Sequence, residues 1–379
     1  GGQGAGVDSA LVHAVVPKPP RASIGDMLYF PLLFGIRLPS YDRSDGLSLP
    51  WGPQFALPDD RLVVDGIVTY RSHLGHFDPS LTATGMLPRS MTARLVAERA
   101  TLSNDGWSVS DLVNSASVGT VGDDGRNYYR SDLITGTVGT HMGAADAPTS
   151  VDLYAGTRFE FDHSVGPEPG AQHQVWTFFD HSDTTGILRP NPPVARGHIG
   201  SVVAGGKIDW LSETGAHAHA SLDVETPWTT PEGGHFVQVT LDGHVEVPTV
   251  FDHRIRLHVH LLGTAGDTAP PQRYAYIGGS NTLPTRDMLD EGGDELAYAS
   301  MIYIVPLHQP VIPYLGSPSI ALRYVVGSAG VQHLPTLTHN IGPRLMLFVF
   351  RAEYLIDPVT HKHAFSFGAS LPTTPIKGL

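Results

Sequence analysis

Apolar and polar residues alternate one for one along much of this 379-residue chain. From Ala216 to Glu225, alanine, leucine and valine alternate with histidine, serine, aspartate and glutamate. From Arg254 to Leu261, arginine and histidine alternate with isoleucine, leucine and valine. A period of two places successive side chains on opposite faces of an extended strand. The pattern therefore predicts strands that have one apolar face and one polar face.

The length of these runs indicates what their apolar faces contact. Most of them are about eleven residues long, whereas strands of soluble sheets usually have ~5–6 residues and a tilted strand needs ~9–11 to cross a bilayer. The predicted strands are Gly46–Leu57, Arg61–His73, Phe77–Leu87, Met91–Leu102, Asn127–His141, Val151–Asp162, Gly197–Trp210, Ala216–Thr226, Phe236–Val247, Asp252–Gly263, Glu295–Pro306, Ser319–Ser328, Leu345–Ile356 and Ala364–Leu371. Because the turn-forming pair Asp242-Gly243 falls inside one run, that run is alternatively a hairpin of two shorter strands.

The pattern predicts an all-β fold, a transmembrane antiparallel β-barrel with about fourteen strands (range about 12–16) and long surface loops. Residues 1–40 are expected to enter or plug the barrel, residues 41–372 to form it, and residues 373–379 to be a C-terminal tail. The alternation lapses over residues 107–126, 165–196 and 264–294, which we interpret as long loops. The first of these could carry a short helix, and the second contains Trp176, Phe178 and Phe179 at the membrane interface or capping the barrel.

Composition agrees with a membrane barrel. Charged residues make up only 16% of the chain, where ~25% is usual in soluble proteins. The longest apolar run, Met27 to Ile36, is interrupted by Pro31 and Gly35 and falls short of the ~18 residues of a membrane helix. A barrel reconciles the two observations because its lipid face is distributed over alternate residues.

The absence of cysteine excludes disulfides and thiolate metal sites, and the net charge of −13 argues against a nucleic-acid partner. An arginine that faced lipid at the bilayer midplane would cost ~2–4 kcal/mol, so the charged parity of each strand must face the lumen. The residues expected to line the lumen are Arg158, Glu160, Arg254, Arg256, His258, His260, Arg351 and Glu353.

Several segments of the C-terminal third carry a family resemblance. They are residues 278–283 (GGSNTL), 293–298 (GDELAY), 303–307 (YIVPL) and 355–358 (LIDP), together with residues 41–47 (YDRSDGL) near the start. These segments resemble the bacterial surface-antigen family, which forms the barrel domain of BamA-type outer-membrane proteins.

The resemblance implies a bacterial outer-membrane barrel in which a glycine-rich loop folds back into the lumen. The residues that match this lumen loop are Gly278, Gly279, Thr282, Leu283 and Arg286. Pro284 and Thr285 stand where the family has Arg-Gly, and Arg286 follows them. The implied partners are outer-membrane lipid and a periplasmic or surface protein.

Twenty histidines raise the question of a metal site. The pairs His217/His219, His258/His260 and His361/His363 have i, i+2 spacing, so both members of a pair point the same way on a strand. Two such pairs on neighbouring strands could bind zinc or copper, with His258 and His260 as the best candidates. We instead interpret these histidines as polar lumen residues and expect no metal and no cofactor.

The sequence gives only weak indications of a hard-cation site or a hydrolytic site. Asp123, Asp124 and Asn127 could bind a hard cation, but an acidic surface turn is the simpler interpretation. His163 beside Asp162, and His181 beside Asp180, could belong to a hydrolytic set, but local hydrogen bonding of loop residues is the simpler interpretation.

The expected function is non-enzymatic: a membrane anchor, a pore or a protein-handling barrel. The alternatives are an outer-membrane barrel hydrolase that uses Asp and His residues of its loops, and a soluble secreted all-β binding protein.

Overall fold

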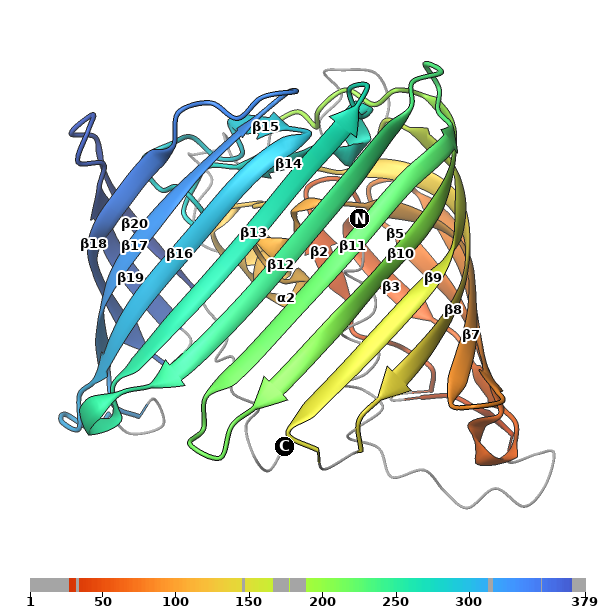
Figure 1. The fold of residues 1–379 in the computed structure, drawn as a ribbon, viewed down its shortest axis with the longest axis horizontal. Coiled ribbons are helices and arrows are strands. Elements are labelled where there is room, and N and C mark those ends of the chain that lie inside the picture. Colours follow the sequence, from red (N-terminus) through yellow and green to blue (C-terminus); the bar gives the residue numbers. More distant parts are fainter. Residues whose placement is uncertain are drawn as a thin grey trace.

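The computed structural model describes residues 27–31, 34–144, 147–165, 177, 189–312, 316–348 and 350–369, and it is dominated by one antiparallel sheet (Figure 1). That sheet has eighteen strands in the described part of the chain, and β14 and β15 form a separate pair. The strands are β1 (Leu28–Tyr29), β2 (Ser40–Asp42), β3 (Gly46–Trp51), β4 (Gln54–Ala56), β5 (Leu62–Arg71), β6 (His76–Leu87), β7 (Met91–Leu102), β8 (Tyr129–Met142), β9 (Thr149–His163), β10 (Gly197–Leu211), β11 (His217–Thr229), β12 (Phe236–Pro248), β13 (Arg254–Gly266), β14 (Ala275–Ile277), β15 (Glu291–Gly293), β16 (Glu295–Pro306), β17 (Ser319–Gly330), β18 (Thr338–Leu347), β19 (Phe350–Ile356) and β20 (His363–Ala369). The helical segments are η2 (Pro58–Asp60), η3 (Asp105–Trp107), α2 (Asp111–Val121), η4 (Val250–Asp252) and η5 (Pro271–Arg273).

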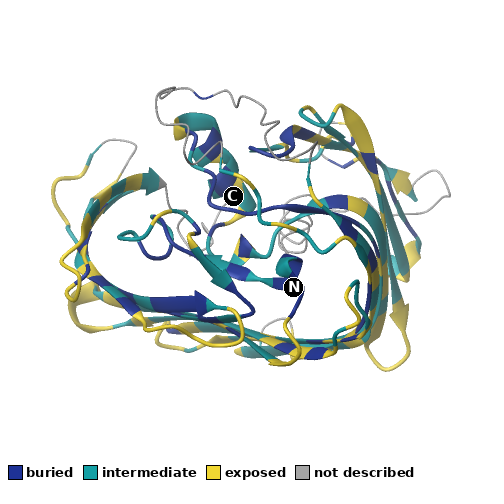
Figure 2. Ribbon diagram, turned by 90° about the horizontal axis from the view of Figure 1, so that it is seen from above, coloured by how far each residue is buried: buried dark blue, intermediate teal, exposed yellow. Residues whose placement is uncertain are grey.

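The strands run up and down in sequence order, each hydrogen-bonded to the next, from β5 to β13 and then from β16 to β20. Figure 2 shows that the sheet curls around an interior. Over the described residues, β20 pairs only with β19, and the other end of the sheet is formed by β2, β3, β4 and β1. Helix α2 packs against both β2 and β20, and therefore lies where the two ends of the sheet approach each other.

The predicted fold class is confirmed: the chain is a transmembrane antiparallel β-barrel. In the described part of the chain, fourteen strands of the main sheet are seven to fifteen residues long. Phe236–Val247 forms one continuous strand, β12, and the hairpin alternative at Asp242-Gly243 is wrong. The predicted strand Gly46–Leu57 is divided into β3 and β4.

One predicted strand, Leu345–Ile356, is wrong. The structure makes a hairpin there: β18 ends at Leu347, Phe348 adopts a positive φ of 55°, and β19 begins at Phe350. Met346 consequently pairs with Arg351 and shares its face, so Met346 does not belong to the apolar outer face. The alternation predicted a single strand because apolar residues continue through the turn, whose sequence contains neither glycine nor proline.

The outer face of the sheet is apolar and exposed. Leu222 pairs with Leu241, and Leu241 with Leu261, so leucines form a row across three strands. Other outward residues with about half or more of their surface exposed include Leu95, Ile134, Leu153, Phe159, Val202, Leu322, Leu345, Phe365 and Phe367. Such a continuous apolar band far exceeds the patches that monomeric soluble proteins expose, and it requires lipid.

Two of the segments where alternation lapses fold into the interior. The helix expected within residues 107–126 is present as α2, with its N-terminus capped by Ser110 and a left-handed Gly122 (φ 80°) at its C-terminus. That segment is not a surface loop, however, because Asn114 and Asp124 are both buried.

Residues 264–294 are held inside by an apolar core. Ile277 and Leu283 have no exposed surface and pack against inner residues of the sheet. The cluster consists of Leu262, Ala275, Ile277, Leu283, Leu296, Tyr298, Val325, Ala329 and Leu355. Burying each large side chain contributes roughly 1.5–3 kcal/mol, which is enough to keep this segment in place without any single dominant contact.

The remaining segments are only partly described. Residues 28–29 pair with β4, and Ile36 bridges to Trp51. Residues 1–26, Trp176, Phe178, Phe179 and residues 373–379 lie outside the described residues, and the predicted domain limits stay predictions. In the described part of the chain, no helix has the length and apolarity needed to cross a membrane.

Candidate functional site

The loop at residues 278–283 is built by its two glycines and its threonine. Gly278 and Gly279 adopt φ values of 125° and 81°, which residues with a Cβ rarely reach. The Thr282 hydroxyl accepts a hydrogen bond from the Gly278 N–H (2.8 Å) and donates one to the Gly278 carbonyl (3.0 Å). The turn is thereby closed on itself, and Leu283 is directed into the apolar core.

Arginines on the inner face of the sheet form hydrogen bonds with this loop. Arg323 donates to the Asn281 carbonyl (2.9 Å) and to Glu353 (2.9 Å). Arg344 donates to the other oxygen of Glu353 (2.7 Å), and Arg351 donates to the Asn281 side chain (2.7 Å). Glu353 is thus the carboxylate that compensates buried arginines, while the loop supplies neutral oxygens that accept further hydrogen bonds from Arg323 and Arg351.

Arg286 does not join that cluster. It donates to the Thr338 hydroxyl (2.9 Å) and pairs with Glu291 (3.1 Å). The arginine that binds the loop is instead Arg323 on strand β17. Arg323 is not among the residues that the sequence predicts to line the lumen, and nothing in its predicted strand indicates that this side chain contacts residues 281–282.

A second ion-pair cluster holds the η5 segment. Arg273 is fully buried and binds Glu225 through two contacts (3.0 and 3.1 Å) and Glu160 through a third. Arg158 also pairs with Glu225. Two of the predicted lumen residues, Arg158 and Glu160, therefore lie together around an arginine of an internal loop. Arg273 could not be identified from the sequence because it lies in a segment without alternation.

Four further predicted lumen residues form pairs within the wall itself. Arg254 and Arg256 each contact a different oxygen of Glu246, both at 2.8 Å. His258 and His260 contact one oxygen of Asp242, at 3.1 and 2.9 Å. All eight predicted residues contact inward-facing groups, and their role in lining a pore stays a prediction.

Asp105 joins the two internal segments. One carboxylate oxygen accepts the Asn127 N–H (2.8 Å) and the other accepts the Tyr276 N–H (3.2 Å). Burial raises the pKa of Asp105 to about 6, opposed by these hydrogen bonds and by the positive charge of Arg189. The junction of the two loops thus depends on a carboxyl group that is poised to titrate in a weakly acidic medium.

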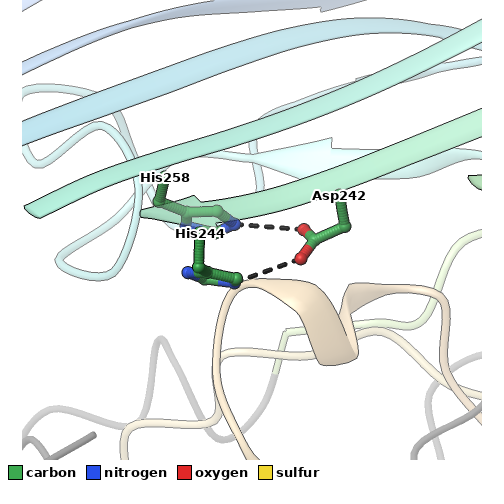
Figure 3. A group of neighbouring side chains, drawn as sticks. All are labelled: Asp242, His244 and His258. Carbon is green, nitrogen blue, oxygen red and sulfur yellow. Dashed lines mark hydrogen bonds and ion pairs between the residues drawn. The ribbon is translucent and has the colours of Figure 1, made fainter. Parts of the chain in front are cut away.

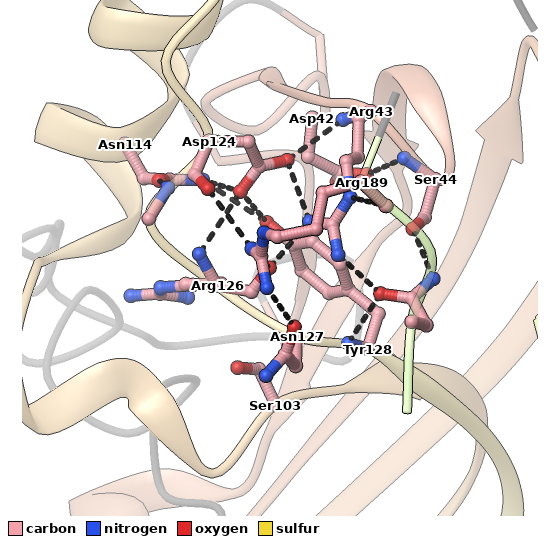
Figure 4. A network of polar contacts seen from close by, with 12 residues as sticks. Asp42, Arg43, Ser44, Ser103, Asn114, Asp124, Arg126, Asn127, Tyr128 and Arg189 are labelled. Atoms are coloured by element: carbon pink, nitrogen blue, oxygen red, sulfur yellow. Dashed lines mark hydrogen bonds and ion pairs between the residues drawn. The ribbon is translucent and has the colours of Figure 1, made fainter. Parts of the chain in front are cut away.

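Asp124 organises a second buried network (Figure 4). It has no exposed surface and accepts hydrogen bonds from the Arg43 N–H (2.9 Å), the Asn114 amide (3.1 Å) and the Tyr128 hydroxyl (3.0 Å). Arg189 adds a bond to the Asp124 carbonyl (3.2 Å). The expected acidic surface turn is therefore wrong at Asp124, whose oxygens are used to fasten the segment around α2 to residues near β2.

The candidate hydrolytic residues do not form a site in the described residues. Asp162 has no exposed surface and accepts a hydrogen bond from the Gln272 amide (3.2 Å), whereas His163 is near the ring of Phe161. Consecutive residues of a strand point to opposite faces, which separates Asp162 from His163. Asp180 and His181 lie outside the described residues.

The interior is not completely filled. A cavity of about 300 Å³ lies against the inner faces of β5 to β12 and is lined by three arginines and five carboxylates, among them Arg158 and Glu160. Its polar lining and size suit a group of water molecules.

This architecture defines a class: an outer-membrane type of β-barrel whose interior holds inward-folded loops. Among solved structures, the chain is similar to BamA from Haemophilus ducreyi lacking POTRA domains 1–3, with a TM-score of 0.54, 13% identity, and coverage of 87% of this chain and 68% of that chain. It also aligns with CdiB from Acinetobacter baumannii (TM-score 0.43, 12% identity, 87% and 58% coverage) and CdiB from Escherichia coli (0.45, 11%, 88% and 60%).

The likeness to BamA shows the fold, and the resemblance predicted from the sequence is confirmed at that level. The chain spans about two thirds of the matched BamA chain and less than two thirds of either CdiB chain. No protein-family model and no curated protein matches the sequence.

Glu353→Gln should strongly destabilise the barrel. The substitution keeps the shape but leaves Arg323 and Arg344 buried without a counter-charge, which costs about 3–5 kcal/mol. The measurement is the free energy of unfolding by urea in detergent micelles. Asp132→Asn is the control, because it breaks the exposed pair with Arg99 and should cost at most about 1 kcal/mol. Equal losses in the two variants would contradict a structural role for Glu353.

Asp105→Asn should remove a component of the pH dependence of stability. Because the folded-state pKa is raised, the neutral carboxyl is favoured in the folded state. The stabilising contribution of the neutral Asp105 carboxyl is fully present below the pKa of aspartate in the unfolded chain, which is near 4. It is lost as the pH rises through about 6, which lowers the free energy of unfolding by up to about 3 kcal/mol. We expect the wild type to lose stability relative to Asp105→Asn between pH 4 and pH 7.5 in urea titrations. Parallel pH profiles would refute this assignment.

Proposed function

We propose that this chain is a protein-handling β-barrel of the bacterial outer membrane, with lipid and protein as its partners and no catalytic activity of its own. The BamA-like fold supports a barrel of this class. The apolar outer band supports a location in a bilayer. Protein handling rests on two further features, the interior and the sheet ends.

The interior favours this role over that of an open diffusion pore. Residues 264–294 are fastened inside by an apolar core and by the Arg273 and Arg323 clusters. The segment with η3 and α2 is fastened by Asp105, which accepts the Tyr276 N–H, and by Asp124, which accepts the Arg43 N–H. A large solute would have to displace both segments, each of which contains buried charges that are costly to unpair.

The sheet ends are the observation that carries the proposal. In the described structure, β20 has one paired edge, and the opposite end of the sheet consists of short strands. An unpaired edge presents N–H and C=O groups that can pair with another extended chain. Helix α2 lies at both ends, and the Ser115 hydroxyl accepts a hydrogen bond from the Tyr41 N–H (3.0 Å). We propose that a client polypeptide binds at this edge when α2 moves aside.

The test uses the absence of native cysteine. Purified chain in liposomes should accelerate the folding of a urea-unfolded eight-stranded barrel protein, measured by its heat-modifiable migration in gels. Gly119→Cys with Tyr41→Cys, joined by a short thiol crosslinker, should abolish the acceleration by fixing α2 to β2, because a Cβ at residue 119 would lie 3.9 Å from the Tyr41 ring. The same variant without crosslinker is the control.

Two outcomes would overturn the proposal. One is the absence of acceleration together with a steady ion conductance in planar bilayers, which would favour a pore. The other is a monodisperse protein in the absence of detergent, which would favour the soluble binding protein.

A further inference from the structure

Three side chains, one carboxylate and two imidazoles, converge on the inner face of β12 and β13 (Figure 3). Asp242 and His244 are two residues apart on β12, and His258 is the register partner of His244 on β13. The His244 Nε2 lies 3.1 Å from one oxygen of Asp242, and the His258 Nε2 lies 3.1 Å from the other. The two imidazole rings stack with centroids 3.9 Å apart.

The geometry is close to that of a metal site. The ligand atoms of Asp242, His244 and His258 all lie within 4.8 Å of one another. Zinc binds imidazole nitrogen and carboxylate oxygen at ~2.0–2.2 Å in a tetrahedron, which places neighbouring ligand atoms roughly 3.4 Å apart. Side-chain rotations without movement of the strands can supply the difference.

We propose that Asp242, His244 and His258 bind a divalent transition metal of the zinc class. Two nitrogen donors and one oxygen donor favour such an ion over calcium or magnesium, which prefer oxygen ligands throughout. The proton that each neutral imidazole shares with Asp242 moves to its other ring nitrogen, so that Nε2 can bind the metal. A water molecule completes the tetrahedron.

The three side chains differ in their exposure to the aqueous interior of the barrel. The His244 side chain is 43% exposed, whereas Asp242 and His258 are 19% and 16% exposed. An ion can therefore enter past His244 from the aqueous interior. The other two ligands are already held in the wall of the barrel.

A neighbouring histidine orients the carboxylate and links the site to an internal loop. His260 is buried and its Nδ1 lies 2.9 Å from the same Asp242 oxygen that contacts His258. The ring of His260 stacks on Trp107 of η3, with centroids 4.2 Å apart and planes 2° from parallel. Such an outer partner fixes a metal ligand and commonly changes affinity 10–100-fold. Metal binding and the placement of Trp107 are consequently coupled through His260.

The experiment is a zinc titration of the folded protein in detergent, in competition with a chromophoric chelator. The wild type should bind one zinc ion per chain, and His244→Ala and His258→Ala should each weaken binding by about tenfold or more. His141→Ala is the matched control, because it removes a histidine that contacts a single carboxylate, Asp152, at 2.7 Å. His141→Ala should leave zinc affinity unchanged.

A second readout keeps the test decisive if an alanine variant does not fold. The conservative variants His244→Gln and His258→Gln replace the alanine variants in the same titration. Copper(II) should quench the fluorescence of the wild type more strongly than that of Trp107→Phe, and the excess quenching should disappear in His258→Gln. Zinc affinity that is equal in wild type and both ligand variants, or no excess quenching, would overturn the site.

Discussion

The structure depends on one constraint: the bilayer core offers no water to polar groups, so the part of each strand that crosses it must place its polar side chains on the inner face. The resulting alternation makes the outer band apolar, with the row Leu222, Leu241 and Leu261 as its clearest part. The same parity concentrates arginine, carboxylate and histidine residues on the inner face. Most other features of the molecule are ways of satisfying those inward groups.

The inner face is satisfied in two different ways. Where the wall is acidic, at Glu160 and Glu225, an internal loop supplies the buried Arg273. Where the wall is rich in arginine, a loop supplies the carbonyl of Asn281 and Glu353 supplies the charge. Forming such buried pairs contributes little net stability, but breaking one is costly, so they select one arrangement of the loops. The interior of this barrel is therefore arranged to hold its loops in place.

The strands that contact lipid could be predicted from the sequence, because their alternation is a local pattern. The inward-folded segments could not, because contacts inside the barrel determine their positions. Strand β7 was predicted with its observed limits, Met91–Leu102, because alternation and turn residues agree there. The β18–β19 hairpin was missed since apolar residues continue through its turn. The inward position of Asp105 and Asp124 could not be predicted, because their partners are distant in sequence and no periodicity connects them.

The candidate metal site was also only partly predictable from the sequence. His258 and His260 were identified from their spacing, but neither of the other two pairs lies on a strand adjacent to β13. His361 precedes β20 and His363 begins it, whereas His217 and His219 lie on β11, which is separated from β13 by one strand. Strand β12 lies between them and contributes Asp242 and His244. These residues also have i, i+2 spacing, which could have found them had Asp242-Gly243 not suggested a turn.

The most direct measurement of the central constraint is a nitroxide scan of β11 in liposomes, made possible by the cysteine-free sequence. Single cysteines at residues 217–225 would be labelled, and their collisions with oxygen and with a water-soluble nickel chelate compared by electron paramagnetic resonance. We predict high oxygen and low nickel accessibility at Ala218, Ala220 and Leu222, with reduced oxygen accessibility at Ser221 and Asp223. Absence of a two-residue period, or nickel access at Leu222, would contradict this prediction.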